Sequence, residues 1–447
     1  MTSNTRVVVI GAGLAGVRLA RRLGELGMSA VLVGDEEHTP YNRVLLAEVL
    51  AGRYAPEVIA LPTPERLTRG RAVHIDRAER LVHFADGSVI AYDTLVLATG
   101  SNPVLPPLRG LFGAFGPDRH ELPEGVHAFR TMDDCLGLSK AVRPDTRAVV
   151  IGGGLLGVSA ARALAERGAQ VVLAQQSERL MERQLDPSAS KLVLRHLKDL
   201  GVEVHTECRV RDVRCVGGAV RSVELADGYA LDADLVVLAC GVHPRVGLAQ
   251  DAGLAVHKGV IVDDQLRTSD PHIRAIGDCA QHDGNVYGLA APALEQADVL
   301  AELLAAADTG AVPGAGSGAG AGSGSGSGST PGSGSGANPA GAPAGYTGTR
   351  ALTRLTLTRP GLASGTPLDL AAFGEHTPLP GDDVIQLTDA TRGTYRKVVV
   401  RDDRLVGGVL VGELGTVGAL ARAWEGAEPL PSDGGPLLHL LTNDGGS

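Results

Sequence analysis

The stretch Val7–Gly16, which reads Val-Val-Val-Ile-Gly-Ala-Gly-Leu-Ala-Gly, decides the fold of this chain. An apolar strand runs into G-x-G-x-x-G and then into a helix-forming segment, which is typical of a dinucleotide-binding unit. Gly11 permits the tight turn, Gly13 lets backbone N–H groups approach a pyrophosphate, and Gly16 lets the helix pack closely on the strand. The helix start, at Leu14 and Ala15, then stabilises the phosphate charge.

A second fingerprint covers Ala148–Gly157 and reads Ala-Val-Val-Ile-Gly-Gly-Gly-Leu-Leu-Gly. Its glycines, Gly152, Gly154 and Gly157, repeat the spacing of the first set. Two such motifs, each in strand–turn–helix context, predict two nucleotides in one protein and hydride transfer between them. A third segment, Ala275–Asp278, ends an apolar strand in a carboxylate, which is costly to bury without a partner and therefore indicates a functional aspartate.

Composition favours an α/β protein. Hydrophobic residues make up 44% of the 447 residues but aromatic residues only 3%, which suits a parallel sheet covered by helices. A net charge of −10 and a pI near 5.7 argue against a nucleic-acid partner. No apolar leader precedes Val7 and no apolar run is long enough to span a membrane, so a cytoplasmic protein is expected.

The cysteines favour buried, unreactive thiols over a redox pair or a metal site. None forms C-x-x-C or shows zinc-ligand spacing, so no metal is predicted. The loop Pro40–Arg43, where a flavin disulfide reductase needs a reactive cysteine nearby, has none. The five cysteines are Cys135, Cys208, Cys215, Cys240 and Cys279.

The order of the segments predicts two Rossmann-like domains, the second inserted in the first. The first domain is expected over 1–115 and 242–306 and the second over 116–241. Residues 307–346 are rich in Gly, Ser, Ala and Pro and predict a disordered linker. A small α+β domain over 347–447 follows, with strands expected at 352–358, 395–400 and 404–411 and a helix at 415–425.

At its motifs the chain resembles the two-dinucleotide flavoproteins of the ferredoxin and rubredoxin reductase family. It is more similar still to the FAD/NAD(P)H-binding part of the large subunit of assimilatory NAD(P)H nitrite reductases. The segments that carry this resemblance are 40–46, 97–101, 129–131, 151–157, 180–186, 241–245, 268–271 and 287–292.

The resemblance implies that the domain over 1–115 and 242–306 is an FAD-binding domain and that the domain over 116–241 is an NAD(P)H-binding domain. It also implies the residues around FAD. An acidic residue is expected after the second strand to bond the adenosine ribose, and Gly34 at the strand end leaves this role to Asp35 or Glu36. The remaining FAD contacts implied by the family are Arg43 and Arg130 near phosphate or flavin, backbone at Ala72 near adenine, the turn Thr99–Gly100, Asp278 on the ribityl chain, and the backbone N–H of Ala291 at the flavin pyrimidine edge.

At the second nucleotide, the position expected to be acidic holds Gln175. A glutamate there would favour NADH, and Arg179 is close enough in sequence to assist NADPH, so the donor is NAD(P)H with the preference open. Many ferredoxin reductases pair a lysine with a glutamate beside the flavin, and here those positions hold Glu48 and Ser159. No catalytic side chain is assigned, because hydride transfer needs positioning more than a side-chain acid.

The resemblance implies an FAD-dependent NAD(P)H oxidoreductase that serves a separate acceptor protein in nitrite or nitrate assimilation. The acceptor would be a sirohaem nitrite reductase, a nitrate reductase, a ferredoxin or a rubredoxin, and a homodimer is compatible with it. The chain has no cysteine after Cys279, so it is expected to be a detached electron-input module. The alternatives are a rubredoxin or ferredoxin reductase of another pathway and a flavin-binding redox sensor without turnover.

Overall fold

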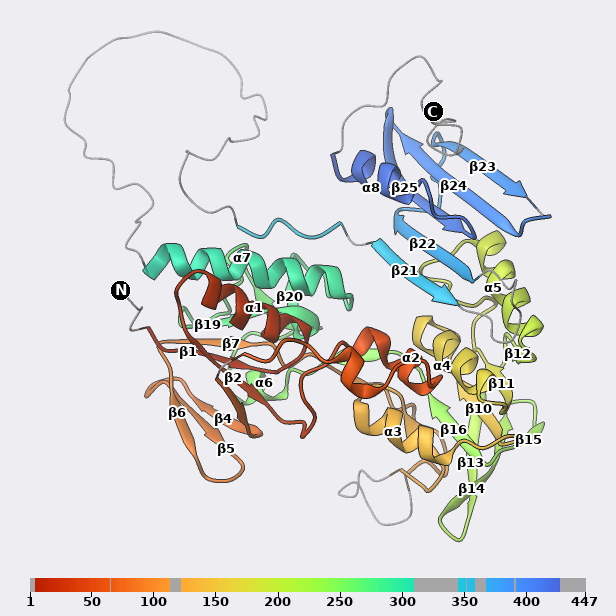
Figure 1. Ribbon diagram of the computed structural model, residues 1–447, viewed down its shortest axis with the longest axis horizontal. Coiled ribbons are helices and arrows are strands. Elements are labelled where there is room, and N and C mark those ends of the chain that lie inside the picture. Colours follow the sequence, from red (N-terminus) through yellow and green to blue (C-terminus); the bar gives the residue numbers. More distant parts are fainter. Residues whose placement is uncertain are drawn as a thin grey trace.

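The computed structural model describes residues 5–64, 66–112, 122–308, 345–350, 352–357, 367–389 and 391–426. Most of the predicted linker and the tail after residue 426 lie outside these ranges. Three multistranded units are arranged along the molecule, and the chain enters the first, passes to the second, returns to the first and ends in the third (Figure 1).

The first unit is built on a parallel sheet of five strands in the order β19-β7-β1-β2-β3. The strands are β1 (Val7–Ile10), β2 (Ala30–Gly34), β3 (Leu67–Arg69), β7 (Thr94–Leu97) and β19 (Ile273–Ala275). Helices α1 (Leu14–Glu25) and α7 (Ala290–Asp308) lie side by side against it, joined by an Arg18–Asp298 ion pair of 2.6 Å (Figure 1). A small antiparallel sheet shares this core and comprises β4 (Ala72–Asp76), β5 (Leu81–Phe84) and β6 (Val89–Ala91).

The second unit repeats this plan with the strand order β12-β11-β10-β16-β9, again all parallel. Its strands are β9 (Val126–Ala128), β10 (Arg147–Ile151), β11 (Gln170–Ala174), β12 (Glu203–His205) and β16 (Leu235–Leu238). Its helices are α3 (Met132–Ala141), α4 (Leu155–Glu166) and α5 (Pro187–Asp199), and an antiparallel sheet joins them as β13 (Val210–Val216), β14 (Ala219–Leu225) and β15 (Ala230–Asp232).

The connection between the two units confirms that the second is inserted in the first. Strand β8 (Ser101–Pro103) leaves the first unit and pairs antiparallel with β17 (Val242–Pro244), which returns from the second. The chain then completes the first unit with α6 (Gly247–Asp251), β18 (Val260–Val262), β19, the short helix η3 (Gly277–Cys279), β20 (Ala280–His282) and α7. Within the described ranges, no helix is both long and apolar enough to cross a bilayer.

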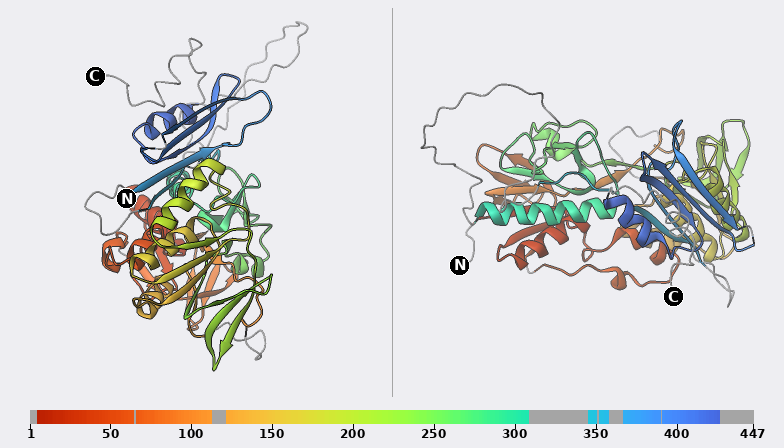
Figure 2. Two further views of the ribbon diagram at one scale, coloured as in Figure 1. Left: turned by 90° about the vertical axis from the view of Figure 1, so that its right-hand side faces the viewer. Right: turned by 90° about the horizontal axis from the view of Figure 1, so that it is seen from above.

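The third unit is an antiparallel sheet in the order β21-β22-β25-β24-β23 with one helix on it. Asp402 and Asp403 have positive φ angles of 49° and 57°, which makes the expected two-residue hairpin turn between β24 and β25. Figure 2 shows this sheet lying over the second unit at one end of the molecule. Its elements are β21 (Leu352–Leu357), β22 (Leu368–Gly374), β23 (Asp383–Asp389), β24 (Thr394–Arg401), β25 (Arg404–Val411) and α8 (Val417–Gly426).

At both ends of the predicted linker, residues expected to belong to it are part of the folded structure. Helix α7 continues to Asp308, and the chain reappears at residue 345 packed against the first unit. Tyr346 is 1% exposed, its N–H donates to the carbonyl of Asp264 at 2.6 Å, and its ring meets the edge of His282 at 4.9 Å. A single aromatic residue therefore anchors the chain before the third unit begins.

A cluster of four charges joins the first two units, with Arg162 and Glu166 buried and Glu48 and Arg53 partly buried. Arg162 of α4 is 1% exposed, and its guanidinium contacts Glu48 of α2 (Leu46–Leu50) at 2.5 Å and Glu166 at 3.0 Å. Arg53 bridges the same two carboxylates at 3.4 and 2.8 Å. Burial raises the pKa of Glu166, while both arginines favour its ionised form, so the cluster is balanced only while all four groups are present.

The third unit docks on the second through Asp186, a buried residue that caps the N-terminus of α5. Its carboxylate accepts hydrogen bonds from the Ala189 N–H at 3.0 Å and the Tyr395 hydroxyl at 2.5 Å, and Lys397 Nζ lies 3.2 Å away. Burial alone would raise the pKa of Asp186, but these partners outweigh it and hold that pKa below its usual value. The half-buried His376, whose pKa is lowered by its partial burial, also lies near this carboxylate.

We expect Arg162→Met to destabilise the protein strongly, because it leaves Glu48 and Glu166 buried with reduced compensation. Breaking a buried ion pair in this way typically costs about 3–5 kcal/mol. Urea unfolding followed by circular dichroism measures the loss. Arg22→Met is the matched control, because Arg22 forms exposed pairs on α1 and should leave the midpoint nearly unchanged. Equal midpoints for the two variants would contradict the role of the cluster.

Asp186→Asn should weaken the docking of the third unit by about 2 kcal/mol at pH 7, the usual worth of hydrogen bonds to a charged group. Folding lowers the pKa of Asp186, so the ionised carboxylate stabilises the folded state. This contribution to stability is complete above the pKa of Asp in the unfolded chain, about 4, and is lost as the pH falls through the pKa of Asp186 in the folded protein. Urea midpoints of wild type and variant should therefore converge below about pH 4. Asp251→Asn, at an exposed site, serves as control, and a pH-independent gap would contradict the assignment.

Candidate dinucleotide-binding cleft

The first glycine turn has no room for side chains at two of its three glycines. Gly11 has φ +117°, a region that favours glycine, and its N–H donates to the carbonyl of Val33 at 2.8 Å. A Cβ at Gly11 would collide with the carbonyl of Ala98, and one at Gly16 would collide with the carbonyl of Gly11. Strand, turn and helix therefore pack as the motif predicts.

The second turn repeats this arrangement. Gly152 has φ +109°, and its N–H donates to the carbonyl of Ala174 at 2.8 Å. A Cβ at Gly152 would collide with the carbonyl of Ala239, and one at Gly157 with the carbonyl of Gly152. The same local geometry thus arises twice from the same glycine spacing.

The middle glycines, Gly13 and Gly154, differ because they face open space. A Cβ at either position would meet nothing within 4 Å, and it would occupy the space beside the helix start. Each glycine precedes a helix, α1 or α4, that has no side-chain cap and no acidic residue in its first turn. The first N–H groups of both helices therefore remain available, and the two cradles fit the pyrophosphates of FAD and of NAD(P)H.

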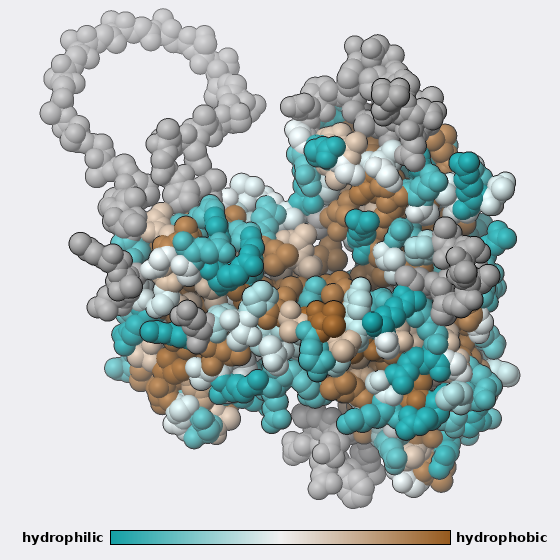
Figure 3. Space-filling view, in the orientation of Figure 1, coloured by the Kyte–Doolittle hydropathy of each residue, from teal (hydrophilic) through white to brown (hydrophobic). Residues whose placement is uncertain are grey.

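Both cradles open into one continuous cleft of about 1910 Å³. Figure 3 shows the surface recessed where the first unit approaches the C-terminal sheet. Strand β21 of the third unit contributes Leu352–Leu355 to the lining, so all three units form the wall. The sequence-predicted residues that line the cleft are Gly13, Leu14, Ala15, Arg43, Gly100, Arg130, Gly152, Gly154, Gln175, Asp278 and Ala291.

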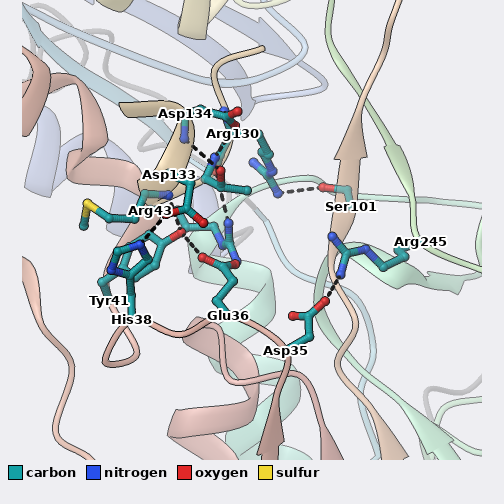
Figure 4. A network of polar contacts seen from close by, with 12 residues as sticks. Asp35, Glu36, His38, Tyr41, Arg43, Ser101, Arg130, Asp133, Asp134 and Arg245 are labelled. Atoms are coloured by element: carbon teal, nitrogen blue, oxygen red, sulfur yellow. Dashed lines mark hydrogen bonds and ion pairs between the residues drawn. The ribbon is translucent and has the colours of Figure 1, made fainter. Parts of the chain in front are cut away.

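Arg130, Ser101 and Asp278 form a polar junction in the first half of the cleft. One guanidinium nitrogen, Arg130 Nη2, donates to Ser101 Oγ at 2.6 Å (Figure 4). The same nitrogen donates to Asp278 Oδ2 at 2.7 Å, and Ser101 Oγ donates to that carboxylate at 2.9 Å. The Gly277 N–H donates to Oε1 of the buried Gln296 at 2.7 Å, which fixes the short helix that carries Asp278. These contacts hold the predicted ribityl carboxylate at the cleft wall.

Asp35 and Glu36 both follow β2 at the carboxyl edge of the sheet, but they point to different partners (Figure 4). Glu36 forms an ion pair with Arg43 and accepts a hydrogen bond from the Tyr41 hydroxyl at 2.6 Å. Burial raises the pKa of Tyr41, so its phenol remains a donor. Asp35 is more exposed and contacts Arg245 at 3.1 Å. Glu36 thus orients Arg43, and Asp35 has the more accessible carboxylate.

Two other predicted residues, Ala72 and Thr99, are not among the residues that line the cleft. Ala72 begins β4 and pairs with Phe84. Thr99 donates from Oγ1 to the carbonyl of Arg245 at 2.8 Å, and so supports the turn at Gly100, which has φ +74°. Ala291, by contrast, is an exposed second residue of α7 on the cleft wall.

The positions of the family's lysine–glutamate pair have new partners. Ser159 lines the cleft, and its Oγ donates to the carbonyl of Leu155 at 2.8 Å. Glu48 instead contacts Arg162, which lies one turn further along the same helix. The family pattern places a cation on α2 and a carboxylate on α4. This chain also has an ion pair between these two helices, but the carboxylate, Glu48, is on α2 and the cation, Arg162, is on α4.

The cysteine thiols are poorly suited to redox chemistry. All five are free, and burial raises the pKa of each, to about 12 for Cys135 and about 11 for Cys240. Cys279, beside Asp278, is fully buried and its Sγ lies 3.3 Å from the carbonyl of Leu97. Cys135 and Cys279 are buried as expected, whereas Cys208, Cys215 and Cys240 are only partly buried, so the expectation of burial is wrong for these three. A protonated thiol is a weak nucleophile, which supports the interpretation of unreactive cysteines.

Sequence reasoning missed several residues of the cleft and its supports. Arg245, which bonds Asp35 and Asn102, gives no local signal, and neither do the cleft-lining Lys258 and Arg354. Gln296 could have been noticed, because it is a polar residue within the apolar helix α7.

Comparison with known proteins agrees with this geometry. Residues 5–297 match the family described as pyridine nucleotide-disulphide oxidoreductase, and residues 365–425 match the rubredoxin NAD+ reductase C-terminal domain. The chain is 36% identical over 66% of its length to an assimilatory nitrate reductase electron transfer subunit of Bacillus subtilis, and 31% identical over 98% to a nitrite reductase (NADH) large subunit of Escherichia coli. It covers 38% and 47% of those relatives, less than half of each.

A solved structure extends the likeness to nearly the whole chain. The putidaredoxin reductase–putidaredoxin complex matches with a TM-score of 0.77 and 25% identity, covering 98% of this chain and 99% of that one. The family match spans both glycine turns and the cleft between them. The chain therefore belongs to the pyridine nucleotide-disulphide oxidoreductase family.

Proposed function

We propose that this protein takes a hydride from NAD(P)H with the help of FAD and passes electrons to a separate acceptor protein. The observation that carries the proposal is that two dinucleotide cradles, centred on Gly13 and Gly154, open into one cleft. FAD, when bound, accepts two electrons together and can release them singly. The protein's part is to hold the two cofactors in contact and to keep solvent from the meeting point.

The residues divide this work along the cleft. The uncapped starts of α1 and α4 bind the pyrophosphates, and the Arg130–Ser101–Asp278 junction fixes the sugar side of the flavin site. The start of α7 presents backbone N–H groups at Ala291, where they would stabilise negative charge on the flavin ring. Strand β21 forms part of the wall, so the third unit shapes the route to the acceptor.

The names of the relatives support a role in nitrate or nitrite assimilation, with a sirohaem nitrite reductase or a nitrate reductase as the acceptor. The same cleft would serve a rubredoxin or ferredoxin reductase of another pathway, and the match of the C-terminal domain to rubredoxin reductases keeps that second candidate. The cytoplasm remains the proposed location, because NAD(P)H is made and consumed there.

Anaerobic mixing with NADH or NADPH tests the proposal. The purified protein should be yellow, and its visible flavin absorption should bleach within seconds because the donor and the flavin share one cleft. Added ferredoxin, rubredoxin or a sirohaem reductase should then restore the absorption, and the fastest of them identifies the acceptor class. A protein that stays colourless after reconstitution with flavin would refute the proposal. A yellow protein that does not bleach would favour the sensor.

Two matched substitutions separate the two cradles. Gly13 and Gly154 have φ angles of −85° and −76°, which any residue adopts, so valine should be tolerated in the fold at either position. Gly13→Val should yield a folded but colourless protein, because its side chain fills the FAD cradle. Gly154→Val should remain yellow and lose at least tenfold in NAD(P)H affinity, measured by nucleotide titration. Loss of flavin from both variants equally would contradict the assignment of the cradles.

A further inference from the structure

The end of β11 is the place where the adenosine ribose of the second dinucleotide would lie. In such folds a carboxylate here bonds the ribose 2′-hydroxyl, whereas a nearby arginine accommodates a 2′-phosphate. This position holds Gln175, whose Oε1 accepts from the Gly153 N–H at 2.7 Å and whose Nε2 donates to the carbonyl of Arg179 at 3.3 Å. The side chain is neutral and bonded into the glycine turn, so it does not repel a phosphate.

A second loop is bonded directly to this strand end. The Gln175 N–H donates to the carbonyl of His205 at 2.8 Å, and the Cys208 N–H donates back to the carbonyl of Gln175 at 2.9 Å. The Glu207 N–H donates to the carbonyl of Ser177 at 3.0 Å. These three backbone bonds place the next residue, Arg209, beside the ribose position.

The guanidinium of Arg209 is available to a ligand. Arg209 is exposed and lines the cleft. Across the part of the chain that the structure describes, no hydrogen bond or ion pair engages its side chain, and the same holds for Arg183 on the neighbouring wall. Arg211, two residues on, differs because it is paired with the buried Glu224.

The carboxylates of this half of the cleft do not cancel these charges. Glu182 lines the cleft and accepts a hydrogen bond from Ser177 Oγ at 2.7 Å. Glu224 is 4% exposed and is shared by Arg211 and Arg214. Among the cleft-lining residues beside Gln175, the two unpaired cations Arg209 and Arg183 thus face one carboxylate, Glu182, which is already engaged by Ser177, an arrangement that attracts an anion.

We infer that this wall is a subsite for a ribose 2′-phosphate, with Arg209 as its principal ligand and Arg183 as its second, so that NADPH is the preferred reductant. The inference rests on the proposed function, since it concerns the donor side of the same cleft. A guanidinium pairs with a phosphate through two parallel hydrogen bonds, and three phosphate oxygens leave acceptors for the second arginine. Arg179, the residue expected from sequence to assist NADPH, is not among the cleft-lining residues.

Calorimetric binding of adenosine 2′,5′-bisphosphate and of 5′-AMP to the flavin-loaded protein tests the subsite without electron transfer. The two probes differ only in the 2′-phosphate. The bisphosphate should bind at least tenfold more tightly, and Arg209→Gln should reduce its affinity about 10- to 100-fold while leaving 5′-AMP unchanged. Arg195→Gln, an exposed position on α5 outside the cleft, should change neither affinity.

The reverse substitution gives an independent outcome. Gln175→Glu restores the carboxylate and should lower the preference for the bisphosphate at least tenfold, with a matching fall in the ratio of kcat/KM for NADPH to that for NADH. Equal binding of the two probes by the wild type, or an unchanged ratio in Arg209→Gln, would overturn the inference. A bisphosphate preference in a protein whose flavin does not bleach would leave the subsite standing and refute the proposed function instead.

Discussion

A pyrophosphate can be held by backbone N–H groups only where the chain itself leaves room for it, and this steric constraint governs both parallel sheets. At Gly11 and Gly152 the turn is so tight that a Cβ would collide with the carbonyl of a neighbouring strand. That tightness brings each helix start to the edge of its sheet, where the middle glycine leaves the N–H groups open. The close packing of α1 and α4 on their strands and the position of both cradles follow from these two turns.

Two cradles become one site only because the units are held in a fixed relation. The pairing of β8 with β17 ties the two crossings between the sheets to each other, and the Glu48–Arg162 cluster fastens the helices that flank them. The third unit adds the Asp186–Tyr395 contact from the other side. The two charged joints are largely shielded from solvent, so their contribution to stability depends on complete pairing of their groups, and the relative position of the units is correspondingly specific.

Two strands of the third unit, β22 and β23, were not predicted from the sequence. Local patterns were sufficient for the two parallel sheets, because each glycine turn is encoded within ten residues. The same holds for β24 and β25, whose alternation and Asp402–Asp403 turn are read within a short window. The polar contacts of the site could not be predicted in this way. Arg130 meets Asp278 across 148 residues, and Arg245 meets Asp35 across 210, so nothing near either residue indicates its partner. The packing of Tyr346 was missed for another reason. The segment 307–346 was judged by its overall Gly- and Ser-rich composition, which does not reveal that one aromatic residue at its end is buried.

The reversed ion pair between α2 and α4 shows which part of the family's plan is free to vary. A charged pair beside the flavin would both fasten the two helices and influence the ring. Here Ser159 leaves the cleft wall uncharged at this one position, while Arg162, one turn further along α4 and 1% exposed, holds the two helices together. Because hydride transfer depends on the distance and orientation of the two rings, a pair that only holds the helices can move away from the cleft without removing what the reaction requires. Holding the two helices together and influencing the flavin ring are therefore separable roles in this fold. In this chain the ion pair holds α2 and α4 together and lies away from the cleft.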